Sequence, residues 1–258
     1  MNKKNRWYNN QAVPWVLPVV VIILWQVLGP YKIIASSILP TPLEVIDASI
    51  RLWESGELQQ HILISTQRAL TGFIIGGLIG FILGLLNGTV LFFEKTTDTT
   101  VQMIRTIPHL ALIPLVILWF GIGESAKVFL VALGVMFPIY INTFNGIKNV
   151  DRKLIEMGSI YGLTKWKLFS NIILPGALAS ILVGVRYALG VMWTSLIVAE
   201  TIGTDAGIGY LATNAREFMQ MDIVVLTIVV YAILGKLSDV IAKLFEHQLL
   251  KWNPAYRK

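Results

Sequence analysis

Six apolar stretches, separated by polar segments, organise the whole sequence. A helix needs about 20 apolar residues to cross the hydrocarbon core of a bilayer, and about 17 to 25 are tolerated. Each stretch comes close to that length, so the pattern predicts an all-α integral membrane protein with six transmembrane helices in one domain, residues 1–258. The expected spans are residues 13–28, 69–93, 100–120, 128–144, 177–199 and 223–245.

The composition agrees with a chain embedded in lipid. Of the 258 residues 55% are hydrophobic and 14% are charged, and the mean hydropathy of +0.68 exceeds that of soluble globular domains. Cysteine is absent and the three histidines (His61, His109 and His247) are scattered, so we expect no disulfide and no metal site. The net charge of +6 would also suit nucleic-acid binding. However, the basic residues flank apolar spans, as in cytoplasmic loops, so we expect no nucleic-acid partner.

The distribution of Lys and Arg predicts the orientation in the membrane. With the N-terminus inside, the cytoplasmic segments are residues 1–12, 94–109, 145–176 and 236–258, and the external segments are residues 29–68, 121–127 and 200–222. The cytoplasmic segments carry 15 Lys and Arg and the external segments carry five, so we expect both termini in the cytoplasm. The basic start (Lys3, Lys4 and Arg6) also fits a signal peptide, but no small-x-small cleavage pattern follows the first apolar stretch.

The second span carries a ridge of five glycines at four-residue spacing: Gly72, Gly76, Gly80, Gly84 and Gly88. Small residues at this spacing lie on one helix face and allow a second helix backbone to approach closely in lipid. Helix packing is the favoured interpretation of the ridge, and a gating hinge is the alternative.

The third span is interrupted by Pro108 and Pro114, with His109 near its cytoplasmic mouth. Proline frees backbone polar groups that neighbouring helices or a water-filled path must satisfy. His109 and Pro114 are candidates for a substrate path or gate, because broken helices line such paths in transporters. A packed kink is an equally good explanation.

Arg186 lies about ten residues inside the fifth span, where a charge is costly unless it faces a partner or water. It could form a structural pair, contact an anionic substrate, or form a gating pair. Glu200, also a candidate for the path or gate, is about 21 Å further along the same helix, so Arg186 needs a partner from elsewhere.

The longest cytoplasmic loop, residues 145–176, is predicted to form two short helices. Asp151 can cap the first helix, which Gly162 is placed to end in a left-handed conformation. Thr164 can cap a second helix that runs to Leu174, and Pro175 then opens the next span. Such a loop is either a docking element for a soluble partner or a compact connection between spans.

Five residues of this loop carry a resemblance to a known family: Glu156, Gly158, Gly162, Leu174 and Pro175. Their spacing resembles the EAA signature of binding-protein-dependent ABC importer permeases, although Met157 stands where the family usually has Ala. The resemblance implies a type I ABC importer permease fold, in which these residues couple the permease to a dimer of cytoplasmic ATPase subunits. No GxxxxGK[ST] phosphate-binding motif occurs in this chain, so ATP and Mg belong to that partner.

Longer stretches, from "IRTIPHLALIPLVILWFGIGESAKVF" to "KWNPAY", resemble the permeases of aliphatic sulfonate importers. Their wider group includes taurine, nitrate and thiamine-precursor pyrimidine importers. The resemblance implies that the chain is not an enzyme and that it forms a homodimer in the lipid of a bacterial plasma membrane. It also implies a periplasmic or lipid-anchored sulfonate-binding protein as a partner. The external acids (Glu200, Asp205, Glu217 and Asp222) outnumber Arg216 in their segment, which favours a docking face for that protein.

Two other classes are weaker. A secondary transporter would need acids inside the membrane for proton or sodium coupling, whereas only Arg186 lies deep in a predicted span. A membrane enzyme would need a serine–histidine pair, a metal-ligand set or paired carboxylates at one site, and the sequence indicates none.

Overall fold

The computed structural model describes residues 13–28 and 39–252, and these residues are helical apart from short connections. They form two compact units. One consists of Met1–His61 and Leu211–Val230, and the other of Ile62–Tyr210 and Tyr231–Lys258. The expectations for residues 1–12 and for the end of the chain after residue 252 lie outside the described residues.

The first unit contains α1 (Val13–Leu28) and α2 (Pro42–Glu54). Thr41 and Glu44 form a reciprocal capping box that begins α2, a motif that satisfies free backbone N–H groups. The backbone N–H of Leu43 donates to Gln26 of α1 over 3.2 Å. The segment 29–68, expected as an external connection, therefore holds a helix of its own.

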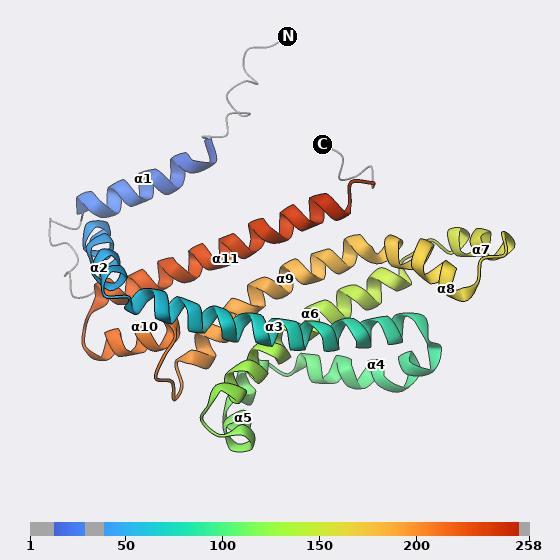
Figure 1. Ribbon diagram of the computed structural model, residues 1–258, viewed down its shortest axis with the longest axis horizontal. Helices are drawn as coiled ribbons and strands as arrows, with labels where there is room; N and C mark the ends of the chain where they lie inside the picture. The colour runs from blue at the N-terminus through green and yellow to red at the C-terminus, as the bar shows by residue number, and fades with distance from the viewer. Residues whose placement is uncertain (1–12, 29–38, 253–258) are drawn as a thin grey trace, which may run out of the picture. The chain divides into compact units, whose positions relative to one another are not determined.

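The second unit holds most of the long helices and the loop between α6 and α9 (Figure 1). Helices α3 and α11 begin in the first unit and continue into the second, whereas α10 begins in the second and continues into the first. The elements after α2 are α3 (Glu57–Thr89), α4 (Leu91–Thr106), η2 (His109–Leu112), α5 (Ile113–Phe120), α6 (Glu124–Lys148), α7 (Arg152–Ile160), α8 (Lys165–Leu168), η3 (Phe169–Ile173), α9 (Leu174–Glu200), α10 (Ile208–Glu217) and α11 (Met221–Leu249).

The glycine ridge of α3 packs against α6. A Cβ added to the five glycines would meet, in chain order, Val131, Ala132, Met136, Tyr140 and Ile147. At Gly76 and Gly80 the obstructing atoms belong to the α6 backbone, so only glycine permits this helix spacing. The structure thus places the ridge in a tight helix–helix contact, as small residues allow in membranes.

A polar network joins α3, α4 and α6 near the start of α4. Tyr140 donates to Asp98 over 2.6 Å and accepts from Asn87 over 2.8 Å, while Thr97 donates to Asn87 over 2.9 Å. Polar groups between apolar helices need such partners because lipid offers none.

The third apolar stretch is sharply bent. Helix α4 ends at Thr106, and the helical segment His109–Phe120 leaves it at 83°. The break lies at Ile107 and Pro108, whereas Pro114 occupies the first turn of α5. Pro114 therefore does not interrupt a helix, because a proline in the first turn loses no intrahelical hydrogen bond.

Among the described residues, four helices are long and apolar enough to cross a membrane, or five if the bent pair counts as one span. The four are Glu57–Thr89, Glu124–Lys148, Lys165–Glu200 and Met221–Leu249. Helix α1 offers a shorter apolar segment, Val16–Val27.

Candidate functional site

Helix α7 begins and ends with the caps that the sequence predicts. The Asp151 carboxylate accepts from the backbone N–H of Lys153 over 2.9 Å. At the other end Gly162 has φ of +75°, and the N–H of Leu163 donates to the carbonyl of Gly158 over 3.0 Å. This is a Schellman arrangement, in which a left-handed glycine turns the chain away from the helix.

The second helix of the loop starts as predicted at Thr164, which accepts from Lys167 N–H, but its predicted end at Leu174 is wrong. The chain stays helical through the π-helical turn η3 into α9. Pro175 explains the π turn, because its ring clashes with the carbonyl four residues back and it has no N–H to donate. Leu174 instead donates to Phe169, five residues back.

Gly158 brings the two loop helices together. A Cβ at this position would lie 2.6 Å from Ile172 and 2.7 Å from Leu168. Next to it, Ile155 packs on a core cluster formed by α6, α9 and the residues after α6: Ile147, Val150, Ala177 and Ile181. Ile155 thus brings α7 into direct packing contact with both long helices.

The loop exposes a group of large apolar side chains. Ile160, Tyr161 and Trp166 are 85%, 80% and 73% exposed, and Leu154 and Met157 are also exposed. The Glu156 side chain lies on the same exposed helix. Figure 1 shows α7 and α8 beyond the ends of α6 and α9. Exposed apolar patches of this kind mark protein interaction sites.

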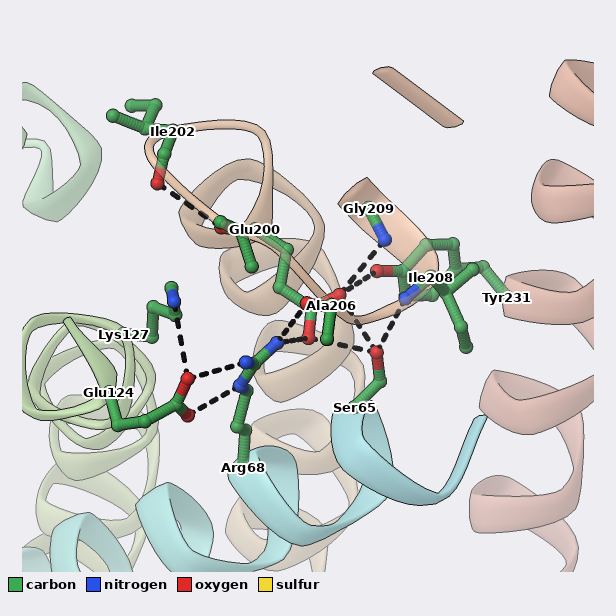
Figure 2. A network of polar contacts seen from close by, with 11 residues as sticks. Ser65, Arg68, Glu124, Lys127, Glu200, Ile202, Ala206, Ile208, Gly209 and Tyr231 are labelled. Atoms are coloured by element: carbon green, nitrogen blue, oxygen red, sulfur yellow. Dashed lines mark hydrogen bonds and ion pairs between the residues drawn. The ribbon is translucent and has the colours of Figure 1, made fainter. Parts of the chain in front are cut away.

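A second site, which the sequence analysis missed, is a buried ion network at the opposite end of α9 (Figure 2). Arg68 of α3 is 5% exposed and donates to Glu200, which is 1% exposed, over 2.8 Å. The Nε atom of Arg68 donates to the carboxylate of Glu124, at the start of α6, over 2.6 Å. Arg68 also donates to the carbonyl of Ala206 over 2.6 Å.

Glu200 is fully surrounded by donors. Besides Arg68, it accepts from Ser65 over 2.8 Å, from the N–H of Gly209 over 2.9 Å and from Tyr231 over 3.1 Å. Buried charges are retained in proteins when they are paired and hydrogen-bonded in this way. The network fastens the chain between α9 and α10 to three long helices.

This burial corrects the expectation for the external acids. Glu200 cannot form part of a docking face, and Asp222 is paired with Arg51 over 2.8 Å in the first unit. Asp205 and Glu217 remain exposed. One sequence signal could have revealed the network, since Arg68 lies four residues before Gly72 and so continues the glycine ridge.

Arg186 has its partner on α11. Its Nε atom lies 2.6 Å from Asp239, whose other oxygen is 3.0 Å from Lys243. The structure therefore places Arg186 in an ion pair, which fits both the structural pair and the gating pair considered from the sequence. The sequence did not indicate Asp239 as the partner of Arg186, because residues 236–258 were assigned to a cytoplasmic segment.

His109 lies beside α9, with Nε2 2.8 Å from the Ser195 hydroxyl. Gly134 of α6 makes room for this contact, since a Cβ there would lie 2.7 Å from the Ser195 oxygen. Ser195 is about 7.5 Å from Glu200 along α9. His109 thus lies toward the end of α9 that is remote from the loop, and its expected place at the cytoplasmic mouth is wrong. The reason is the turn at Pro108, which the sequence pattern does not position.

Comparisons with known proteins agree on the kind of molecule. A family model described as "Binding-protein-dependent transport system inner membrane component" matches residues 76–251. The chain is 58% identical over 246 residues to SsuC of Escherichia coli (strain K12), covering 95% of this chain and 94% of SsuC. It is 44% identical over 241 residues to SsuC of Bacillus subtilis (strain 168), covering 93% of this chain and 87% of that protein. Both are named as aliphatic sulfonates transport permease proteins.

A solved structure shows the same fold. The crystal structure of an amino acid ABC transporter with histidines contains a chain that superposes with a TM-score of 0.64 at 18% sequence identity. The match covers 77% of this chain and 96% of that one.

Proposed function

The chain belongs to the family of binding-protein-dependent transport system inner membrane components, and from this membership we propose that it is the membrane-spanning subunit of an ATP-driven importer of aliphatic sulfonates. The observation that supports this substrate is the sequence identity to SsuC of Escherichia coli along nearly the whole chain. The chain is a transport subunit, and ATP and Mg are bound by its partner.

The proposed architecture has six spans, in a type I ABC importer permease fold. α1 supplies the first span and the bent α4–α5 pair the third. Both termini lie in the cytoplasm, because the Lys-rich and Arg-rich segments then lie inside. Two copies of the chain form the pathway in the plasma membrane, joined to two ATPase subunits. A periplasmic or lipid-anchored binding protein delivers the substrate to the opposite side.

Coupling runs through the loop between α6 and α9. The exposed apolar side chains around Ile160 dock on the ATPase, and Glu156 and Gly162 shape this contact. Gly158 and Ile155 then transmit motion of α7 to α6 and α9 through direct packing. Leu174 and Pro175 form the continuous helical connection from the loop into α9. ATP drives the cycle because it binds the two states with different affinity.

A secondary transporter is the weaker alternative. Its strongest candidate for proton coupling would be the buried Glu200, but this carboxylate is held by Arg68 and three further donors. Its oxygens are therefore occupied by contacts within the protein. The docking loop would also have no role in a transporter that works without an ATPase.

The test is reconstitution of the chain with its ATPase and binding protein in liposomes. ATP-dependent uptake of an alkanesulfonate, taurine, nitrate and a thiamine-precursor pyrimidine is measured separately. Uptake of the alkanesulfonate that requires both partners is the expected result. If the complex takes up another of these substrates but not the alkanesulfonate, the substrate assignment is overturned and the importer architecture stands. Uptake without the ATPase would overturn the architecture.

A further inference from the structure

Two adjoining grooves run along the exposed face of α9 within the second unit. The smaller has a volume of 430 Å³ and is lined by Arg105 of α4, Phe137 and Asn142 of α6, and Val183 and Tyr187 of α9. The larger, of 630 Å³, is lined by Arg186, Thr194 and Asp239 among others. Val183 and Tyr187 line both grooves, so the two adjoin at these residues.

Arg105 is the cation of the smaller groove, and no acidic side chain of the described residues lines that groove. Within residues 13–28 and 39–252, Arg105 is exposed and has no ion pair or side-chain hydrogen bond. Arg186 in the larger groove differs, because it is ion-paired with Asp239, which also pairs with Lys236 and Lys243. The smaller groove therefore carries an uncompensated positive charge.

Arg105 lies in the last turn of α4, one residue before this helix ends at Thr106. The groove places it beside Val183, which is about 14 Å along the apolar helix α9 from Leu174. An unpaired arginine beside this part of an apolar helix is unfavourable in lipid, so it should face water or an anionic ligand.

The neighbouring face of α9 is also unsuited to lipid. Tyr187 is 66% exposed, and Thr194 is exposed about two turns further along the helix. Tyr187 lines both grooves, and Thr194 lines the larger one. Polar side chains within membrane helices are favoured where they face a cavity or another helix.

We infer that the smaller groove is a sulfonate-binding site in the membrane pathway, in which the Arg105 guanidinium binds the anionic head group. This inference rests on the proposed function and adds to it the residue that selects a negatively charged substrate. A guanidinium can donate two parallel hydrogen bonds to an oxyanion, and the Tyr187 hydroxyl adds a further donor. Phe137 and Val183 supply apolar surface for the alkyl chain. Arg186 plays no part in head-group binding because Asp239 occupies it.

The first experiment tests the site without transport. Because the chain has no cysteine, the V183C variant has a single thiol and nearly preserves the side-chain volume. The purified complex is labelled in liposomes with an anionic reagent (methanethiosulfonate ethylsulfonate) and a cationic one (its ethyltrimethylammonium analogue). We expect reaction with both and protection by alkanesulfonate. R105Q should change the two rates roughly fivefold in opposite directions, as expected for one unit charge about 4 Å away in water, and so lower the anionic-to-cationic rate ratio roughly 25-fold, whereas R105K preserves the ratio.

An unreactive thiol in the V183C variant, or a rate ratio that R105Q leaves unchanged, would overturn the site. I74C is the matched control, since Ile74 is exposed on α3 but lines neither groove, and it should stay unlabelled in lipid.

The second experiment measures alkanesulfonate uptake. R105Q should lower uptake at least tenfold while stimulation of the ATPase by the binding protein persists, and R105K should restore part of it. K95Q, a change at an exposed lysine on the same helix, should leave uptake intact. Normal uptake by R105Q would overturn the inference while leaving the proposed function standing. Absence of uptake by the unmodified complex would instead count against the proposed function, and the labelling ratio would still decide the charge of the groove.

Discussion

Arg68 and Glu200 lie 132 positions apart in the chain, yet their side chains meet at 2.8 Å in a buried network. Around this pair, Glu124, Ser65 and Tyr231 bring together α3, α6, α9 and α11 (Figure 2). The loop between α6 and α9 leaves from the other end of α9. The long helices are thus held by polar contacts at one end and are connected to an exposed apolar surface at the other.

Replacing Arg68 by Met should destabilise the protein by about 3–5 kcal/mol, because it leaves the buried Glu200 carboxylate without its counter-charge. E200Q should have a smaller effect, since Glu124 still holds Arg68. Thermal unfolding in detergent, followed by tryptophan fluorescence, measures both.

R51M is the matched control for R68M. The Arg51–Asp222 pair has the same 2.8 Å separation but is solvent-exposed, so its loss should cost less than about 1 kcal/mol. Equal destabilisation by R51M and R68M would contradict the role of burial.

Replacing Gly76 by Ala should destabilise the α3–α6 contact by about 1–3 kcal/mol, the usual effect of overpacking. The added methyl group meets the backbone at Ala132, which cannot rotate away. G77A on the same helix provides the control, because the nearest atom is the flexible end of Ile139 at 3.2 Å and alanine favours helix. A melting temperature for G76A equal to that of G77A would refute the packing account.

Replacing Gly162 by Val should impair coupling, because φ of +75° costs an L-residue about 1–2 kcal/mol and is worse for a branched one. Space is not the obstacle, since a Cβ there would meet no atom within 4 Å. Uptake and stimulated ATP hydrolysis should fall at normal protein levels. G162N should retain more activity, because asparagine tolerates the left-handed conformation. Wild-type transport by G162V would count against the coupling assignment.

Replacing Arg186 by Ala should lower uptake without loss of protein, since Asp239 keeps Lys243 at 3.0 Å. If the ion pair is what matters, D239A and the double variant should show the same deficit as R186A, as residues that act together are not additive. Normal uptake by R186A at normal protein levels would remove Arg186 from the mechanism.

The sequence alone determined the local features of this protein. Apolar length predicts helices suited to lipid, four-residue glycine spacing predicts a packing face, and the caps at Asp151, Thr164 and Gly162 were predicted correctly. Each of these depends on residues within a few turns of one another, so it is readable in the linear pattern. The same approach misplaced the end of the second loop helix, because the π turn lets the chain continue past Pro175 without a break.

Only the tertiary structure decided which charges meet. Arg186 and Arg105 both lie in helices of the second unit, but one is ion-paired with Asp239 and the other lines a groove in which no described side chain is acidic. Likewise Glu200, expected at an external surface, is buried against Arg68. The physical reason is that such pairs depend on the rotation and bend of helices that are distant in the chain, as at Pro108. Hydrophobic periodicity specifies which segments are helical, but the packing of helices against one another determines their polar partners.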